Sequence, residues 1–359
     1  TQFHTSPSLM RMRRYSVNLY RQLQADGDEA VGWRQVGSLR VASSKDHLKA
    51  LQRQVGQAKA IGLDVEVTTP AEALRLFPQM TGDSLYGALH IPGDGYLDPS
   101  GVTHALARRA RDLGVAVHTG VRVTGIEISP RGEVTRVVTD HGAINTEIVV
   151  NAAGMWAPRI GAMVGVNLPM TPLVHQHLTT KPIPGHELPW ETPVLRDPAN
   201  LVYMREEAHG FLVGGFETTP KTCFVDGAPW EFTQQLFPPD WELFGELMEG
   251  AVRRVPVLAR AEIVTLVNGP EAITPDSRPL LGPVPGVRGF YVAAGQSHTG
   301  FGGGGAIGQI MAEWIVEGEP SQDTHEYNVR RFGPIYADPR YTAERSRESY
   351  KYYYFLRYP

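Results

Sequence analysis

The segment Gly-Gln-Ser-His-Thr-Gly-Phe-Gly-Gly-Gly-Gly at 295–305 is the strongest local signal for chemistry in this sequence. It follows an apolar run with strand character at 289–294 and precedes apolar residues at helical spacing from Ile307 to Ile315. The first N–H groups of a helix have no partner inside the helix, and glycines let a ligand approach them closely. We therefore predict a site for an anionic group, or for a ring that becomes anionic. A flexible glycine loop without a ligand is the alternative.

Serine-hydrolase chemistry is excluded for this segment. A nucleophile elbow needs a glycine at the position that Thr299 occupies, two residues after Ser297. Ser297 and His298 are also adjacent in sequence, so their side chains cannot face each other as nucleophile and base.

A second candidate is the sequence His175-Gln176-His177, which lies in a run with strand character. Side chains two residues apart on a strand share a face, so both imidazoles point the same way. We favour a polar cavity wall in which His175 acts as a base or a hydrogen-bond partner. A metal site is less favoured because only His186 and Asp197 are near enough in sequence to complete it. A purely structural histidine is the third interpretation.

Two side chains further along could complete such a cavity. Arg196 is a cation suited to anchoring a carboxylate, and Tyr203 supplies a phenol. Arg196 also precedes Asp197 directly, so a local ion pair is the alternative for this arginine.

Small residues mark the end of a predicted strand at 148–150. Its β-branched residues indicate a strand that is buried on both faces. Ala153 and Gly154 leave almost no side-chain bulk, so a backbone or a ligand ring could approach them closely. Trp156 and Pro158 then lead into a helix. Packing of the strand-to-helix connection alone explains the same residues equally well.

Hydrophobic periodicity predicts helices and strands in alternation in the first part of the chain, and mainly strands from Pro169 onward. A capping box, Thr69-Pro70-Ala71-Glu72, opens a short helix. The expected helices are 8–23, 48–61, 70–77, 102–113, 158–165, 240–255 and 307–315. The expected strands are 36–42, 115–117, 121–128, 134–139, 148–150, 173–180, 201–205, 210–216 and 289–294.

Composition excludes several classes of protein. The 359 residues suffice for two domains or one large one, and 34 basic against 38 acidic residues indicate neither nucleic acid nor a membrane surface as the main partner. The single cysteine, Cys223, excludes an intrachain disulfide and fits a reducing compartment. No apolar run is long enough to span a bilayer. We expect a cytoplasmic location, or the mitochondrial matrix in a eukaryote, and a fragment of a longer protein.

Several motifs together resemble the D-amino-acid-oxidase-like flavoproteins. They are VVNAAGMWA, NGPEAITPDSRPLLG and FYVAAGQSHTGFGGGGAIGQIMAEWI. Four more, GDGYLDPSGV, PLVHQHLTT, PVLRDPANLVYMRE and RVPVL, are similar to the dimethylglycine and sarcosine dehydrogenase group. The resemblance covers nearly the whole chain.

The resemblance implies FAD as cofactor and the oxidation of a small N-methylated amino acid by hydride transfer to the flavin. Oxygen or an electron-transfer flavoprotein would accept the electrons. His175 and Tyr203 match the active-site histidine and tyrosine of the family. The positions that match cofactor contacts are Val123, Ala153, Gly154, Trp156, Gly295, Gln296, Ser297, His298, Thr299, Gly300 and Phe301.

The chain also departs from the family pattern. The first βαβ unit, with its G-x-G-x-x-G pyrophosphate loop, is absent. A covalent link to the flavin would use a histidine outside this chain, which His4 does not match. The folate-binding domain of the family is absent too. The residues at 296–299 differ from those usual in this loop, which leaves the amine substrate open.

The implied fold class is α/β (α+β), a partial Rossmann-like FAD-binding domain interleaved with an antiparallel β-sheet substrate domain. The expected FAD-binding parts are 1–35, 93–165 and 266–330, the sheet-domain parts are 36–92 and 166–265, and 331–359 is a linker toward an absent domain. The alternative function is that of a non-catalytic regulatory relative, similar to the regulatory subunit of pyruvate dehydrogenase phosphatase. We also expect the fragment to bind no FAD by itself.

Overall fold

A computed structural model describes residues 1–354 of the chain and shows a mixed α/β fold. Positions 355–359 of the expected linker lie outside the described residues. The helices are α1 (Pro7–Ala25), α2 (Lys45–Ala60), α3 (Pro70–Leu76), α4 (Pro99–Asp112), α5 (Ala157–Ala162), α6 (Trp241–Arg254), α7 (Gly300–Val316) and α8 (Pro339–Lys351). The strands are β1 (Ser38–Ala42), β2 (Glu66–Thr68), β3 (Gly87–Ile91), β4 (Val123–Ile128), β5 (Val134–Thr139), β6 (Gly142–Asn145), β7 (Val149–Asn151), β8 (Thr171–Thr180), β9 (Val194–Asp197), β10 (Val202–Glu207), β11 (Gly210–Gly215), β12 (Ile263–Ile273), β13 (Leu280–Pro283) and β14 (Phe290–Ala294).

An eight-stranded sheet, here called the large sheet, has the order β12-β8-β11-β10-β9-β1-β3-β2. Its pairs are antiparallel except that of β1 with β9, so strands from the first hundred residues join strands from the second half of the chain. The sheet holds the strands of both segments predicted for the substrate domain. β12 runs across the predicted boundary at 266 and lies in this sheet along its whole length.

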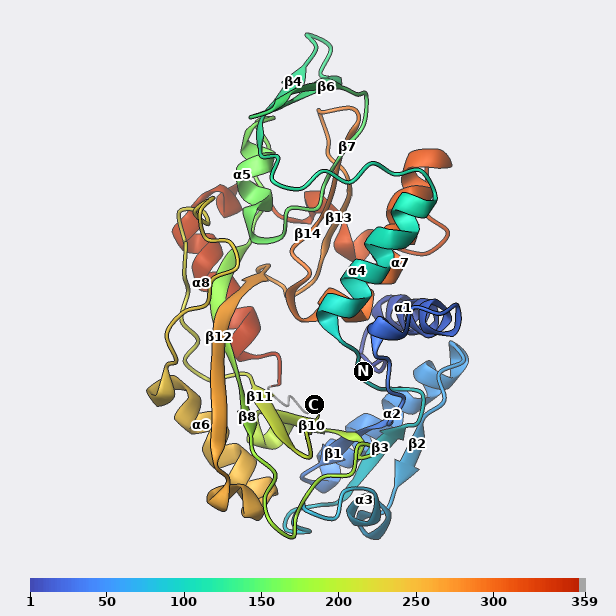
Figure 1. The fold of residues 1–359 in the computed structure, drawn as a ribbon, viewed down its shortest axis with the longest axis vertical. Coiled ribbons are helices and arrows are strands. Elements are labelled where there is room, and N and C mark those ends of the chain that lie inside the picture. The colour runs from blue at the N-terminus through green and yellow to red at the C-terminus, as the bar shows by residue number, and fades with distance from the viewer. Residues whose placement is uncertain (355–359) are drawn as a thin grey trace.

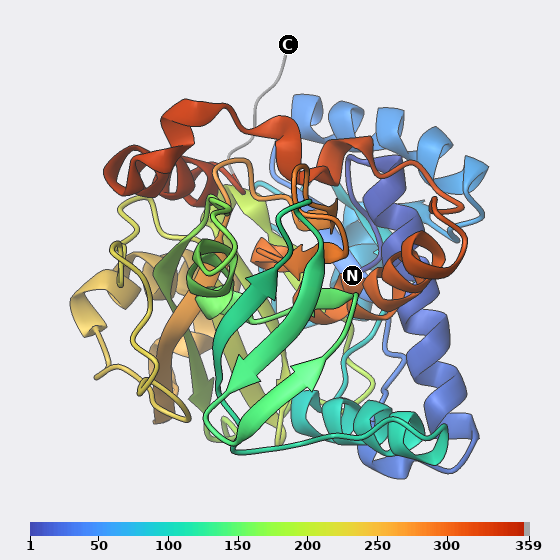
Figure 2. The same ribbon diagram turned by 90° about the horizontal axis from the view of Figure 1, so that it is seen from above.

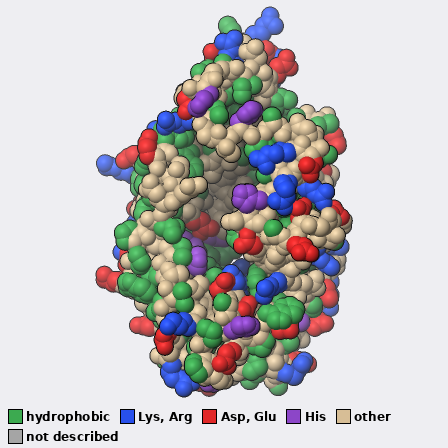
Figure 3. Space-filling model, in the orientation of Figure 1, with side chains coloured by type: hydrophobic (Ala, Val, Ile, Leu, Met, Phe, Trp, Pro, Cys, Tyr) green, Lys and Arg blue, Asp and Glu red, His purple; other side chains and the backbone are tan. Residues whose placement is uncertain are grey.

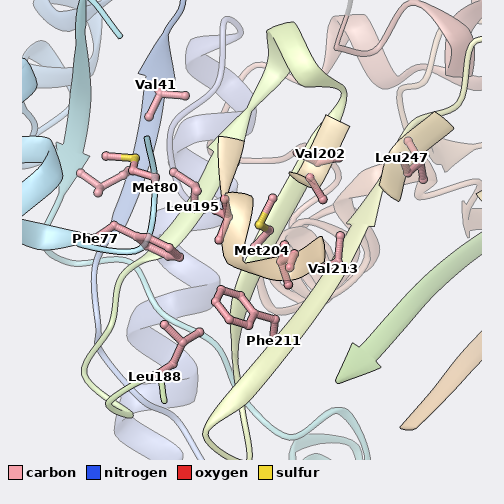
Figure 4. Close-up of a cluster of buried hydrophobic side chains, with 14 of the residues drawn as sticks. Val41, Phe77, Met80, Leu188, Leu195, Val202, Met204, Phe211, Val213 and Leu247 are labelled. Atoms are coloured by element: carbon pink, nitrogen blue, oxygen red, sulfur yellow. The ribbon is translucent and has the colours of Figure 1, made fainter. Parts of the chain in front are cut away.

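One face of the large sheet carries the main hydrophobic core (Figure 4). Alternate residues of its strands, such as Leu195, Met204 and Val213, are completely buried there. α6 covers this face with Leu247, and Phe77, the residue that follows α3, adds to the cover. α3 and α6 thus cover one face of the sheet. The other face is apolar at β1 and β3, where Ala42, Leu89 and Ile91 pack with α2, and it carries polar side chains nearer its middle.

A second sheet, here called the small sheet, consists of β13, β14 and β7, with β7 parallel to β14. A separate antiparallel meander of β4, β5 and β6 stands at the top of the molecule (Figure 1). Both belong to one hydrophobic cluster with α5, in which Val134, Ala157 and Phe290 are buried. α1 and α7 lie side by side next to this part of the chain (Figures 1 and 2).

Two expectations about strands are wrong for the described residues. No strand forms at 115–117, where Val115 and Val117 are exposed. The strand at the small sheet is not buried on both faces, because Ile148 is 42% and Val150 is 39% exposed. β7 pairs with β14 along one edge, and in residues 1–354 nothing pairs with its other edge. At 115–117 and 148–150, the apolar residues therefore give a strand-like pattern in the sequence, although no element of residues 1–354 buries them fully.

The glycines at 302–305 belong to the first turns of α7 and not to a loop. Glycine is unfavourable in a helix by about 1 kcal/mol relative to alanine, so a packing reason is needed. α1 supplies it: a Cβ at position 305 would lie 2.9 Å from the Leu19 side chain and 3.1 Å from the Cα of Ser16. The loop proper is thus confined to Gly295–Thr299, with a 3₁₀ turn over Ser297–Thr299.

The C-terminal part expected as a linker contains α8, which packs against β8 and β12. Its Tyr350 is fully buried, and Tyr354 beyond it is 2% exposed. This segment therefore contributes side chains to the centre of the molecule.

Candidate active site

The polar face of the large sheet carries a row of functional side chains. Strand register places Arg40 of β1 beside Arg196 of β9, and Arg196 beside Tyr203 of β10. Cross-strand neighbours share a face, so these side chains point to the same side. The alternation expected for β8 is also found, since Gln176 is buried in the core while His175 is only partly buried on the polar side.

Tyr203 can reach His175 because its neighbour on β11, Gly214, has no side chain. Tyr203 is the register partner of Gly214 on β11, and a Cβ at Gly214 would lie only 2.4 Å from the Tyr203 hydroxyl. The phenol therefore lies over Gly214 and reaches Nε2 of His175, at 3.2 Å from its hydroxyl oxygen. The structure brings together the two residues predicted to be catalytic.

A hydrogen-bonded chain continues from the other side of the imidazole. Nδ1 of His175 lies 2.7 Å from the hydroxyl of Tyr350, and that hydroxyl donates to Glu217 at 2.5 Å. The second carboxylate oxygen of Glu217 is buried and has no hydrogen-bond partner within residues 1–354. Sequence reasoning missed Glu217 and Tyr350. Their signal was weak, an acidic residue after the apolar end of β11 and a tyrosine in an unusually aromatic segment.

Burial sets the protonation of this chain of groups. It lowers the pKa of His175, with Glu271 opposing and His298 assisting, so the imidazole is neutral at pH 7. Burial is also the main cause that raises the pKa of Tyr203. It raises the pKa of Glu217 to about 7, although the hydrogen bond from Tyr350 opposes the shift.

The charge of Glu217 decides which nitrogen of His175 carries the proton. An ionised carboxylate can only accept, so the single Tyr350 proton is directed at it. The Tyr350 oxygen then accepts from Nδ1–H of His175, and Nε2 keeps its lone pair facing Tyr203. A protonated Glu217 permits the reverse arrangement, in which Tyr350 donates to Nδ1.

The loop at 295–299 lies against the polar side of the large sheet, near His175. Oγ of Ser297 accepts a hydrogen bond from the backbone of Thr274 at the end of β12, at 3.2 Å, which fixes the loop on the sheet. Nδ1 of His298 lies 3.4 Å from Glu271, whose carboxylate is 4.0 Å from Nδ1 of His175. The loop predicted to border a cofactor thus lies next to the predicted catalytic pair.

Two buried polar atoms in this loop fit a ring with hydrogen-bonding edges. Within the described part of the chain, the Gln296 side-chain oxygen and Nε2 of His298 are buried without a hydrogen bond, whereas Nδ1 of His298 faces Glu271. The α7 N-terminus begins at Gly300 and adds a positive dipole end. Gly300 and Phe301 are exposed beside it. Buried donors and acceptors without partners are costly, so a ligand that satisfies them would be stabilised here.

The remaining predicted cofactor contacts lie on a separate part of the structure. Val123 and Ala153 are partly buried and pack against the hydrophobic cluster that contains residues of α5. Gly154 has φ +56°, which explains a glycine by backbone conformation alone, and the space at its Cβ position is open. The indole of Trp156 donates to the carbonyl oxygen of Pro229 at 2.8 Å. None of these side chains contacts His175 through a hydrogen bond found in residues 1–354.

The alternative considered for Arg196 is decided by the partner of Asp197. The local ion pair of Arg196 with Asp197 is wrong, because Asp197 pairs with Arg254 at 2.6 Å in the core. No group of His, Cys, Asp and Glu in the described residues is arranged to hold a metal ion. No helix among them is long and apolar enough to cross a membrane.

Comparison with known proteins gives one consistent result. A family model described as FAD dependent oxidoreductase matches residues 1–314, and one described as FAD dependent oxidoreductase central domain matches 317–359. The whole chain is 38% identical to human mitochondrial sarcosine dehydrogenase and 34% identical to dimethylglycine dehydrogenase of Rattus norvegicus. It covers 40% and 42% of those proteins, so it spans about two fifths of the length of these relatives.

Two further matches bear on function and fold. The mitochondrial pyruvate dehydrogenase phosphatase regulatory subunit of Mus musculus is 33% identical over 97% of the chain, which covers 40% of that protein. The crystal structure of L-proline dehydrogenase from P. horikoshii superimposes with a TM-score of 0.81 at 28% identity. That superposition covers 92% of this chain and 85% of the other.

Proposed function

The chain belongs to the FAD dependent oxidoreductase family, and on that premise we propose that it oxidises the N-methyl C–N bond of a small amino acid such as sarcosine or dimethylglycine. The family model agrees with the resemblance drawn from the sequence. The observation that carries the proposal is the contact between His175 and Tyr203 on the polar face of the large sheet, beneath the glycine loop.

The residues that would hold the flavin ring are those of the loop from Gly295 to Phe301, which have the orphaned polar atoms. Val123, Ala153, Gly154 and Trp156 would line the remainder of the cofactor site. When bound, FAD supplies the acceptor for the hydride that leaves the N-methyl carbon. The α7 N-terminus would stabilise negative charge that develops on the ring. Oxygen or an electron-transfer flavoprotein would be the final electron acceptor.

His175 and Tyr203 would prepare the amine for this step. Hydride loss from the N-methyl carbon needs the nitrogen lone pair, so the amine must be neutral. With Glu217 ionised, Nε2 of His175 has a free lone pair, and this atom would take the ammonium proton. The Tyr203 hydroxyl lies 3.2 Å from the same nitrogen, and its oxygen can accept from Nε2–H once the proton has been taken, so it would hold the amine beside the pair.

The decisive experiment is His175→Ala in the full-length protein. We expect sarcosine-dependent loss of the oxidised flavin absorbance to slow by roughly 10²-fold or more, the usual worth of a positioned base, with the amount of bound flavin unchanged. His177→Ala is the matched control. His177 lies on the same strand and face, and in residues 1–354 its side chain makes no hydrogen bond. An unchanged rate in His175→Ala would refute the assignment.

A regulatory role is the second candidate, because the similarity to the phosphatase regulatory subunit extends over nearly the whole chain. Such a protein would use the same fold as an interaction surface. It would bind flavin without bleaching in the presence of sarcosine or dimethylglycine, and it would change the rate of a pyruvate dehydrogenase phosphatase. The intact His175–Tyr203 contact favours the enzyme.

A further inference from the structure

One acid, Glu217, is completely buried at the end of the hydrogen-bonded series that begins at His175. The hydroxyl of Tyr350 lies 2.5 Å from the Glu217 carboxylate and 2.7 Å from Nδ1 of His175. In residues 1–354 Glu217 forms no ion pair, and its second carboxylate oxygen has no hydrogen bond. Burying a carboxylate without a compensating cation is costly, so its presence here calls for a reason other than stability.

The charged groups that face Glu217 from neighbouring elements are themselves acids. Glu246 on α6 accepts hydrogen bonds from the backbone and the hydroxyl of Thr218, at 2.9 and 2.8 Å, and Glu271 lies on β12. Burial is the main cause that raises the pKa of Glu217 to about 7, the charges of these two acids add to the shift, and the hydrogen bond from Tyr350 opposes it. Glu217 therefore exists both with and without its proton near neutral pH.

The groups between Glu217 and the substrate side favour their neutral forms. Burial raises the pKa of Tyr350 well above its usual value, and the charge of Glu217 raises it further. Burial lowers the pKa of His175, with Glu271 opposing and His298 assisting. A charge on the phenol or on the imidazole is therefore costly, so a proton that enters at His175 is not stabilised there.

The same heavy-atom positions serve two arrangements of protons. With Glu217 ionised, Nδ1–H of His175 donates to Tyr350, and Tyr350 donates to Glu217. With Glu217 protonated, its O–H donates to Tyr350, and Tyr350 donates to Nδ1. The first arrangement becomes the second when each proton moves to its acceptor along an existing hydrogen bond, and no heavy atom has to be displaced.

A second acid near His175, Glu271, is less suited to receive a proton. Its carboxylate is 4.0 Å from Nδ1 of His175, beyond hydrogen-bond distance, and 3.4 Å from Nδ1 of His298. Burial opposes the shift, but His298 and His175 leave the pKa of Glu271 lowered. Glu271 thus keeps its charge near neutral pH, whereas Glu217 can lose it.

Phe216 packs against two members of this series. Its ring centroid lies 5.5 Å from that of His175 and 5.3 Å from that of Tyr350, and the side chain is buried. The face shown in Figure 3 is hollowed near its middle, between the small-sheet part above and the large sheet below. A proton held at the surface of such a hollow exchanges with water, whereas Glu217 has no exposed surface.

We propose that Glu217 is the final acceptor of the proton that the substrate amine loses, reached through His175 and Tyr350, which deepens the proposed function and rests on it. When a proton reaches Nε2, the Nδ1–H bond breaks and an O–H bond forms on Tyr350. The original Tyr350 O–H bond breaks as an O–H bond forms on Glu217. His175 changes tautomer, Tyr350 stays a phenol and Glu217 becomes neutral. These three residues are here called the proton relay, in which Tyr350 and Glu217 are positioning residues that act through His175.

The first test follows the proton in the flavin-loaded full-length protein. Sarcosine is added without oxygen at pH 8, where Glu217 is ionised, and infrared difference spectra are recorded together with the flavin absorbance. We expect the carbonyl band of a protonated carboxylic acid to appear as the flavin bleaches, and to be missing in Glu217→Gln. A band that persists in Glu217→Gln would assign the proton to another acid and overturn the proposal.

The two signals distinguish failure of the relay from failure of the reaction on which it rests. A carboxylic acid band without bleaching refutes the proposed oxidation and supports the relay, because binding of the amine alone then protonates Glu217. Bleaching without the band refutes the relay and supports the oxidation. The lack of both signals contradicts both proposals.

The second test interrupts the relay with Tyr350→Phe, which removes one hydroxyl and keeps the buried ring. At pH 8 we expect kcat/KM for sarcosine to fall roughly 10²-fold, the lower end of the effect of a positioned base. Only amine that is already neutral in solution can then react, so kcat/KM in the variant should rise about tenfold per pH unit, while that of the parent levels off above pH 7. A loss of the same size at every pH would indicate a structural role and overturn the relay.

Matched variants complete this test. Tyr341→Phe removes a hydroxyl from the same helix, where the ring packs on Tyr336 at 5.2 Å between centroids, and should leave kcat/KM and its pH profile unchanged. Glu217→Gln combined with Tyr350→Phe should be no slower than the slower single variant, because the two residues act in series. Losses that multiply in the double variant would show independent roles and overturn the relay.

Discussion

The large and the small sheet are both built from β-branched and apolar strands, but only the large sheet is closed against water on its apolar face. In the large sheet, Leu195, Val202 and Val213 are completely buried under α6 and α3. In the small sheet, Val150 of β7 is 39% exposed, and in residues 1–354 the outer edge of β7 has no partner strand. The two regions therefore differ in how much of their core this chain supplies.

The large and the small sheet also carry different kinds of candidate site. The polar face of the large sheet carries a hydrogen-bonded set of groups, from Glu217 through Tyr350 and His175 to Tyr203, with every distance at 3.2 Å or less. Of the residues proposed to border a cofactor near the small sheet, Gly154 has open space at its Cβ position. The polar face of the large sheet is thus formed by connected side chains of this chain, whereas the proposed cofactor residues near the small sheet are not connected to one another in this way.

The largest expected effect on stability concerns Glu217, a buried acid that follows β11 of the large sheet. Burial raises its pKa from 4.5 to about 7. Below pH 4.5 both the folded and the unfolded chain hold the proton, so the group has no effect on stability. Between pH 4.5 and 7 only the unfolded chain releases it, so the folded state loses stability progressively, by roughly 3 kcal/mol in total. Above pH 7 the loss stays constant.

Glu217→Gln removes this loss, because an amide does not titrate. We expect the variant to gain stability over the parent as the pH rises from 4.5 to 7, measured by urea unfolding at each pH.

Turnover of the parent should rise through pH 7 as His175 acquires its Nε2 lone pair, and the variant should lack this step. Glu191→Gln, at an exposed position, should show no such trend. A stability difference that is constant between pH 4 and 8 would contradict the assignment.

The second effect concerns the contact between Gly214 and Tyr203. A methyl group at Gly214 would lie 2.4 Å from the Tyr203 hydroxyl, so the phenol must move away from His175. We expect Gly214→Ala to cost about 2 kcal/mol in stability and to lower turnover roughly 10-fold. Gly269→Ala on β12 is the control, since its added methyl would meet only Leu236 at an ordinary 3.5 Å. Equal behaviour of the two variants would show that Tyr203 is not held by Gly214.

Sequence patterns predicted which side chains share the polar face of the large sheet, because short-range rules govern that placement. The two-residue period of β8 placed His175 and His177 on one face, and the capping box at Thr69 and Glu72 is present as expected. The position of Tyr203 in a strand also followed from alternation. What the sequence did not reveal is the pairing of β1 with β9, which sets Arg40 beside Arg196, because register between strands that are distant in sequence leaves no local pattern.

The errors have physical causes as well. Consecutive glycines at 302–305 predicted a loop, but close packing of α7 on α1 outweighs their poor helix propensity. Leu113, the last residue of the helix predicted at 102–113, follows the end of α4 and is 86% exposed, since helical periodicity cannot say where a helix loses contact with its core. Tyr350 was missed as a site residue because its contact with His175 joins residues 175 positions apart.

The smallest effect tests the open edge directly. Val150→Thr in the 359-residue chain should change stability by less than about 0.5 kcal/mol, because the side chain is 39% exposed on a strand with one free edge. Val292→Thr on the adjacent strand β14 should cost roughly 1–3 kcal/mol, because that side chain is completely buried and the new hydroxyl would lack a partner. Urea unfolding of both variants measures the contrast.

Equal costs would mean that β7 is covered in solution, and a dependence of stability on protein concentration would then identify a second copy as the cover. In a longer protein that places a further strand against β7, the cost of Val150→Thr should rise to that of Val292→Thr, and flavin affinity should fall with it.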